Sequence, residues 1–169
     1  MRAKEEEILA GVDRAAARPR LPRTTKVGRR GEKARAYLAL QGIDAAELLG
    51  AAWEARRYAH APYSGFAVGA ALLGRSGAIY RGCNLENASY GLTLCAERAA
   101  LAQAVLGGER GVAAVAVVAR GDGLHAPCGA CRQALAEFGP NLTVITQKKE
   151  GGDFLVFSLA ELLPVPFRL

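Results

Sequence analysis

The sequence predicts an α/β domain of three layers, α-β-α, in which a mixed sheet of about five strands carries helices on both faces. Three observations predict it: segments rich in Ala, Leu and Glu alternate with short β-branched strands, glycine-containing turns separate them, and one strand is apolar throughout. A chain of 169 residues is long enough for one domain with a sizeable hydrophobic core, and too short for two domains that each have such a core.

The N-terminal part differs from the rest in charge. Residues 14–35 carry nine basic side chains against the single acid Glu32. We therefore predict that residues 1–43 form a basic, flexible extension, with a short helix over 4–17, and that residues 44–169 form the folded domain. The extension is either a polyanion-binding arm, for instance for nucleic acid, or a solvated tail; we favour the tail because no aromatic side chain alternates with the arginines.

The first half of the domain reads as a helix followed by a β-hairpin. Asp44 is a suitable N-cap for a helix over 45–58. Two short apolar runs follow, 67–73 and 78–83, and the Gly-Arg-Ser-Gly segment 74–77 joins them. Such turn chemistry between apolar runs predicts antiparallel pairing.

The centre of the domain alternates between loop, helix and strand. The polar stretch 84–94 predicts a surface loop, and the composition of 95–106 favours a helix that Gly107 ends. The β-branched run 112–119 predicts a strand buried on both faces. A second helix begins at Pro127 or Cys128 and runs to about residue 138.

The C-terminal part predicts a second antiparallel pair and a short helix. Residues 142–146 and 154–157 are apolar, and a short glycine-containing segment separates them. Ser158 and Glu161 match a capping box for the last helix.

Two motifs predict a metal site. Cys95 and Glu97 form a C-x-E motif, and Pro127 precedes the C-x-x-C motif of Cys128 and Cys131. Three thiols can hold zinc with one coordination position left for water, which is the arrangement of a catalytic zinc. Zinc lowers the pKa of such a water to roughly 7, and Glu97 is then in reach to carry the proton. This combination matches the three-cysteine form of the zinc deaminase signature.

Other interpretations of the cysteines remain. A structural zinc site could use Cys83 as a fourth ligand, although such sites more often show two C-x-x-C motifs. A redox dithiol at Cys128 and Cys131 is a weaker alternative, since the expected redox context is missing. His125, three residues before Cys128, would fill the open position if it were a ligand, so we do not assign it to the metal.

The charge of three thiolates on zinc needs compensation. Both motifs lie at predicted helix N-termini, where the helix dipole favours thiolate at Cys95 and Cys128. We expect Arg98, directly after Glu97, to donate hydrogen bonds to the thiolates from outside the metal's ligand shell.

Several motifs together resemble the small homotetrameric, zinc-dependent cytidine deaminases, over about residues 45–167. The resemblance rests on five segments, which are residues 61–72, 82–90, 95–98, 127–133 and 161–167. It implies that Cys95, Cys128 and Cys131 bind one zinc ion per subunit and that Glu97 shuttles protons. The implied reaction is hydrolysis of cytidine and 2′-deoxycytidine to the uridines with release of ammonia, in pyrimidine salvage.

The resemblance also implies substrate contacts. Phe66 would pack beside the pyrimidine, Asn84 and Glu86 would hydrogen-bond the ribose 3′-hydroxyl, and backbone N–H groups around Ala96 would meet the base O2. Phe167 would reach the site of a neighbouring subunit and cover the base, which implies a homotetramer with shared sites.

Three alternative functions stay open from the sequence. They are a deaminase of a related aminopyrimidine such as blasticidin S, a polynucleotide-editing deaminase, and a non-catalytic zinc-stabilised binding module. No apolar run approaches the ~20 residues of a membrane span, and the four cysteines suit a reducing cytoplasm. We therefore expect a cytoplasmic protein that binds a nucleoside, has no membrane partner and does not use its basic arm on nucleic acid.

Overall fold

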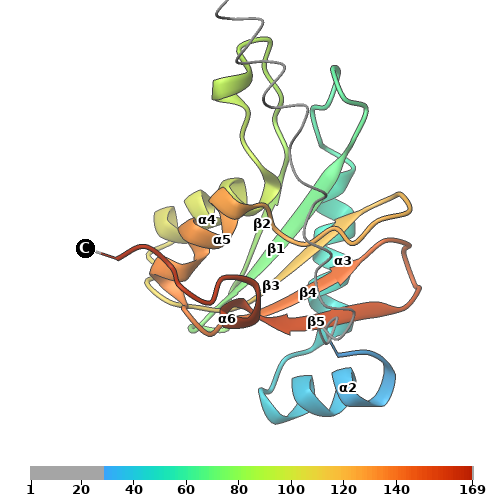
Figure 1. Ribbon diagram of the computed structural model, residues 1–169, viewed down its shortest axis with the longest axis vertical. Coiled ribbons are helices and arrows are strands. Elements are labelled where there is room, and N and C mark those ends of the chain that lie inside the picture. Colours follow the sequence, from blue (N-terminus) through green and yellow to red (C-terminus); the bar gives the residue numbers. More distant parts are fainter. Residues whose placement is uncertain (1–28, 169) are drawn as a thin grey trace, which may run out of the picture.

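The structure, a computed structural model that describes residues 29–168, contains a five-stranded sheet in the order β2-β1-β3-β4-β5 (Figure 1). Only β3 and β4 pair in parallel, so the sheet is mixed, as predicted. The strands are β1 (Val68–Gly74), β2 (Ile79–Cys83), β3 (Val112–Ala119), β4 (Thr143–Gln147) and β5 (Phe154–Ser158). The predicted helix over 4–17 lies outside the described residues, as do five of the nine basic side chains of residues 14–35.

Helices cover both faces of this sheet, which confirms the three layers. One face carries α2 (Gly31–Leu40) and α3 (Ala45–Arg56), and the other carries α4 (Ala96–Leu106) and α5 (Gly129–Phe138). A 3₁₀ turn, η1 (Tyr90–Leu92), interrupts the predicted loop, and the short α6 (Leu159–Leu162) follows β5. None of the helices described is both long and apolar enough to cross a membrane.

Alternation along β1 and β3 divides the core into two clusters. Ala70 and Leu72 of β1 face α4 and α5, whereas Ala71 faces α2 and α3. On β3, Val115 and Val117 pack with the first set, and the intervening residues pack with the second. Because side chains alternate across a strand, one apolar run can serve both cores, as predicted for 112–119.

Two glycines bring a helix close to the sheet on each face. A side chain at Gly69 would lie 2.7 Å from Arg56 Cβ of α3, and one at Gly82 would lie 3.0 Å from Ala100 Cα of α4. Both distances are below ordinary van der Waals contact. The position of α4, and hence of its N-terminus, depends on the absence of a side chain at Gly82.

The predicted caps are present. Asp44 Oδ1 accepts from the backbone N–H of Ala46 at 2.8 Å and of Glu47 at 3.1 Å, and α3 begins at Ala45. At α6, Glu161 N–H donates to Ser158 Oγ at 3.3 Å and Ser158 N–H donates to Glu161 Oε2 at 2.7 Å, which completes the capping box.

Helix α2 was not predicted, and it lies within the segment assigned to the flexible extension. Its Ala34 and Leu38 are buried in the same cluster as α3. Before it, Arg29 exchanges two backbone hydrogen bonds with Val156 of β5, at 2.7 and 3.0 Å, and its guanidinium pairs with Glu161 at 3.0 Å. These contacts attach residues 29–40 to the β5 side of the domain.

Candidate active site

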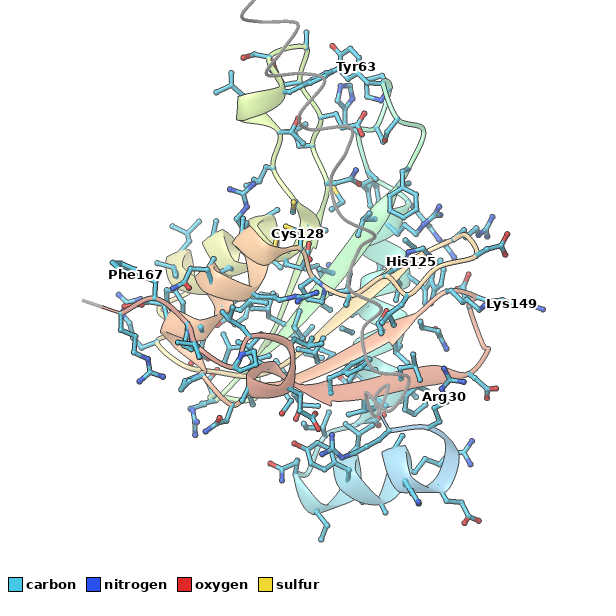
Figure 2. The ribbon with its side chains drawn as sticks, in the orientation of Figure 1. Arg30, Tyr63, His125, Cys128, Lys149 and Phe167 are labelled. Carbon is cyan, nitrogen blue, oxygen red and sulfur yellow. The ribbon has the colours of Figure 1, made fainter. Side chains whose placement is uncertain are left out.

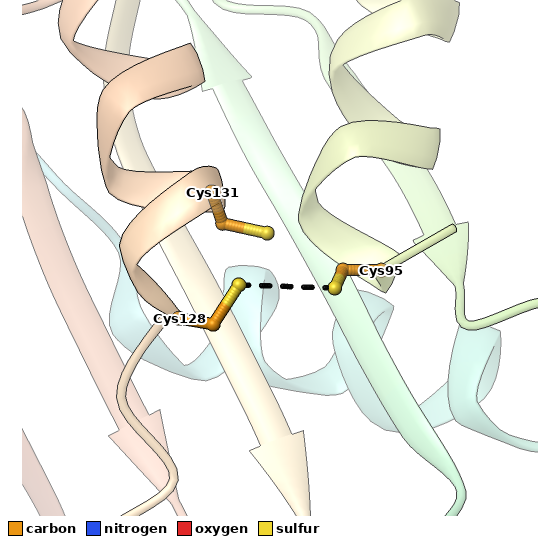
Figure 3. A group of neighbouring side chains, drawn as sticks. All are labelled: Cys95, Cys128 and Cys131. Atoms are coloured by element: carbon orange, nitrogen blue, oxygen red, sulfur yellow. Dashed lines mark hydrogen bonds between the residues drawn. The ribbon is translucent and has the colours of Figure 1, made fainter. Parts of the chain in front are cut away.

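Three thiols meet between the starts of α4 and α5 (Figure 3). Cys95 is the N-cap of α4, Cys128 is the N-cap of α5, and Cys131 follows in the first turn of α5. The Sγ atoms of Cys95 and Cys128 are 3.9 Å apart, and all three sulfurs lie within 4.8 Å of one another. Tetrahedral zinc, with Zn–S of about 2.3 Å, separates its sulfur ligands by about 3.8 Å. The cluster therefore fits zinc.

The other candidate ligands lie apart from this cluster. Among the described residues, neither Cys83 nor His125 belongs to it. The Cys83 Sγ instead donates to the Tyr58 carbonyl at 3.4 Å, and burial raises the pKa of this thiol. Cys83 therefore lies outside the thiol cluster, and the residues that the structure describes form no four-cysteine site.

The protein groups act differently on the three thiols. Burial opposes ionisation of Cys128, but hydrogen bonds from Cys131 and Cys95 outweigh it, so the pKa of Cys128 is lowered. Burial, and then the Glu97 carboxylate, raise the pKa of both Cys95 and Cys131. Without metal, the net effect of these groups favours thiolate at Cys128, whereas desolvation and a nearby negative charge disfavour it at Cys95.

Glu97 is buried in the first turn of α4, beside the thiols. Its side chain is 5% exposed, and burial raises the pKa of its carboxyl. A carboxyl whose pKa is moved toward neutrality can both accept and release a proton at the operating pH. This is the property that a single acid-base residue needs.

Arg98 lies next to the thiols, as predicted. A hydrogen bond to Cys95 raises the pKa of its guanidinium, with a smaller contribution from Cys131. Its Nη2 donates to the Thr93 carbonyl at 3.1 Å, while its buried Nε finds no acceptor among the described residues. This unpaired Nε–H group can donate a hydrogen bond to a sulfur that becomes a thiolate when a cation binds.

A cavity of about 350 Å³ opens in front of Glu97. Four of the predicted substrate-binding residues line it, namely Phe66, Asn84, Glu86 and Ala96. Two of the thiols, those of Cys95 and Cys128, also face it. The structure thus brings the metal-binding and substrate-binding predictions together in one place.

Asn84 and Glu86 already have partners in the protein. Asn84 bridges the start of β1, because its Oδ1 accepts from Val68 N–H at 2.8 Å and its Nδ2 donates to the Phe66 carbonyl at 3.0 Å. The Glu86 carboxylate accepts from the N–H of Tyr63 at 2.9 Å, from the N–H of Ser64 at 3.1 Å and from the Ser64 hydroxyl. The Ser64 hydroxyl bond is the main cause of the lowered pKa of Glu86. Both residues therefore also shape the cavity wall.

Phe167 lies away from the cavity of its own chain (Figure 2). Its side chain is 70% exposed, and the Gln133 amide holds its backbone through two hydrogen bonds of 2.9 Å. The side chain therefore points outward from a fixed backbone.

Sequence reasoning missed several supporting residues. The Ser64 hydroxyl donates to the Glu86 carboxylate and accepts from the Phe66 N–H. The Gln133 amide oxygen accepts from the Phe167 N–H and so fixes the C-terminal segment. Arg132 donates to the Pro127 carbonyl at 2.7 Å and to that of Leu162 at 2.9 Å, and so ties the Cys128 loop to α6. In the sequence, only their position directly after Cys131 indicated that Arg132 and Gln133 support the site.

Comparison with known proteins agrees with this geometry. Residues 44–147 match the family described as the cytidine and deoxycytidylate deaminase zinc-binding region. The chain belongs to this deaminase family. The match covers both cysteine motifs, so membership accounts for the thiol cluster and for the carboxyl beside it.

Individual deaminases resemble the chain over nearly their full length. The cytidine deaminase of Sporosarcina psychrophila is 47% identical over 127 residues, covering 74% of this chain and 92% of that protein. That of Halalkalibacterium halodurans is 49% identical over 125 residues, covering 74% and 95%. The crystal structure of cytidine deaminase from Burkholderia pseudomallei gives a TM-score of 0.70 at 49% identity, covering 74% of this chain and all of that one. About a quarter of this chain has no counterpart in these relatives.

Proposed function

We propose that this protein catalyses the hydrolytic deamination of cytidine and 2′-deoxycytidine to the uridines, within pyrimidine salvage. The observation that carries the proposal is a buried carboxyl with a raised pKa, Glu97, which lines a nucleoside-sized cavity beside a cluster of three thiols. In this proposal Cys95, Cys128 and Cys131 hold the zinc. When bound, zinc supplies a water molecule that ionises near neutral pH.

Glu97 would then move both protons of the reaction. It accepts a proton from the attacking water and delivers it to N3, as the water oxygen bonds to C4. It next takes the remaining proton of that oxygen to the amino nitrogen, so that the C4–N bond breaks and ammonia leaves. Glu97 ends in its starting charge state, which one residue with a pKa raised by burial can achieve.

The cavity walls would orient the nucleoside. Phe66 packs beside the pyrimidine, and the N–H of Ala96, in the first turn of α4, donates to the base O2. The side chain of the N-cap residue Cys95 makes no capping hydrogen bond, which supports this use of the first turn. Asn84 and Glu86 hydrogen-bond the ribose 3′-hydroxyl. They use the donor and acceptor sites that their hydrogen bonds within the protein leave free.

Substrate competition tests the proposed activity. Purified protein with its zinc content measured would be given cytidine, 2′-deoxycytidine, single-stranded RNA and blasticidin S, and ammonia release would be followed. We expect rapid release from the two nucleosides alone. Activity on RNA without activity on free cytidine would favour a polynucleotide-editing enzyme, and activity on blasticidin S alone would favour the related aminopyrimidine deaminase. No release from any of them would favour a zinc-stabilised binding module.

We also propose a homotetramer with shared sites. Phe167 is exposed and does not line the cavity of its own chain, which supports a role in a neighbouring subunit. The loops beside the cavity carry further exposed side chains, Tyr63, Tyr90 and Leu92, which suit burial in an assembly. A cytoplasmic location is part of the proposal, because all four cysteines are free thiols.

Mixed subunits test the sharing of sites. The variants Phe167→Ala and Glu97→Gln each lack one essential side chain, and co-expression would place both in one oligomer. If sites are shared, some sites regain both side chains and the mixture exceeds the summed activity of the separate variants. Activity equal to that sum, or a monomer by light scattering, would contradict the shared site.

A further inference from the structure

We propose that His125 is a positioning residue for the nucleoside site and that it acts by holding the Phe66 ring. The inference rests on the proposed function, because it concerns the wall of the same cavity. Both rings line the cavity that contains Glu97. Their centroids are 5.3 Å apart and their planes are inclined by 60°, a favourable aromatic arrangement.

Phe66 is fixed at its backbone but little restrained at its ring. Its N–H donates to Ser64 Oγ at 3.0 Å, and its carbonyl accepts from Asn84 Nδ2 at 3.0 Å. The residue as a whole is 42% exposed, and within the described residues His125 is its one aromatic neighbour. The contact with His125 is therefore the aromatic contact through which the orientation of the ring can be set.

His125 is in turn held from two sides. The Thr146 hydroxyl of β4 donates to its carbonyl at 3.1 Å, and Thr146 is itself buried. The loop before it folds over the imidazole, because a side chain at Gly121 would lie 3.5 Å from His125 Cε1 and Nε2, and 3.9 Å from Phe66 Cε2. His125 thus connects β4 of the central sheet to the cavity wall.

Within the described residues the His125 imidazole makes no hydrogen bond, so it acts on Phe66 through its surface. Its Nε2 is buried and has no partner among the described residues. A buried polar atom without a partner lowers stability, and replacing it by an apolar group of similar shape is neutral or favourable. A phenyl ring at this position should therefore support Phe66 as well as histidine does.

Two substitutions at this position separate the possibilities. We expect His125→Ala to raise KM for cytidine by about two- to tenfold, the range for one aromatic pair, with kcat within about twofold. His125→Phe should keep KM near the wild-type value and should not lower Tm. Unchanged KM in His125→Ala, a loss confined to kcat, or the same KM rise in both variants would overturn the proposal.

A double-mutant cycle distinguishes positioning from general destabilisation. In a Phe66→Ala background, His125→Ala should raise KM no further, because the ring it acts through is gone. A full additional rise would show an effect independent of Phe66 and would overturn the proposal. If His125→Ala does not fold, Thr146→Val, which removes the hydrogen bond to the His125 carbonyl, takes its place and should raise KM less; an unchanged KM in that variant counts against the proposal.

The failure of the proposed function would look different. A zinc-loaded wild-type protein without turnover of cytidine would contradict the deaminase proposal alone. The same variants would then be compared by the Kd for cytidine in place of KM, with the same expected ratios and the same refuting outcomes.

Discussion

Gly82→Ala tests whether the packing of α4 on β2 sets the geometry of the active site. The new Cβ would overlap the Ala96 carbonyl oxygen and the Ala100 nitrogen, and would lie 3.0 Å from Ala100 Cα. Carbon atoms pack comfortably at about 3.5–4.0 Å, so α4 must move away from the sheet by about 0.5–1 Å. These neighbours are backbone atoms, and no side-chain rotation can relieve the overlap.

The displacement would act directly on the chemistry, because Cys95 and Glu97 lie at the start of α4. Misplacing a reacting group by about 1 Å costs up to about 100-fold in rate, and overpacking a core costs about 1–3 kcal/mol. We therefore expect Gly82→Ala to lower kcat by about ten- to 100-fold, to bind zinc more weakly, and to lower Tm by several degrees.

Steady-state cytidine turnover, zinc stoichiometry and thermal unfolding measure the three effects on one preparation. Gly50→Ala is the matched control, because Gly50 lies within α3 and a side chain there meets no atom within 4 Å. It should leave kcat and zinc unchanged and raise stability by about 0.5–1 kcal/mol. A Gly82→Ala protein with wild-type turnover, zinc content and Tm would refute the reasoning.

Three further predictions concern the metal and the start of the domain. Cys128→Ala should lose zinc while Cys83→Ala keeps it, and full zinc in the first variant would remove Cys128 from the ligands. Burial strongly raises the pKa of Cys131, so zinc uptake must release protons; the affinity of chelator-treated protein should rise with pH, and a pH-independent affinity would contradict this. Leu38→Ala, at a buried position of α2, should lower stability by about 2–3 kcal/mol without changing kcat, whereas Leu40→Ala, at an exposed position, should change neither. Equal Tm values for these two variants would place α2 outside the cooperative domain.

The features predicted best depend on neighbours within a few residues. Asp44 caps α3 through N–H groups two and three positions away, and Ser158 and Glu161 cap α6 in the same way. Cys128 and Cys131 meet because they occupy one helical turn. Such local relations are visible in sequence spacing.

The features that were missed depend on contacts between distant segments. Helix α2 buries only Ala34 and Leu38, among charged residues, so its apolar pattern is too sparse to separate it from the basic extension. The contact of His125 with Phe66 requires the loop after β3 to meet the start of β1. The division of the chain at residue 44 stays a prediction, which the Leu38 variant addresses.

The ionisation of the thiols could be predicted from the sequence only in part. A helix N-terminus favours thiolate wherever it occurs, and Cys128 follows that rule. At Cys95 burial and the Glu97 charge outweigh this effect, and both appear only once the chain is folded. Competition between opposing electrostatic effects therefore needs the tertiary structure.

Glu97→Gln tests the central claim most directly, which is that this carboxyl moves the protons at a three-thiol zinc site. The measurement is cytidine turnover by zinc-loaded wild-type and variant proteins, with zinc counted on the same samples. We predict equal zinc content and a loss of turnover of at least about 100-fold, because general acid-base catalysis supplies about 10²–10⁴. Near-normal turnover by a fully zinc-loaded Glu97→Gln protein would contradict the account.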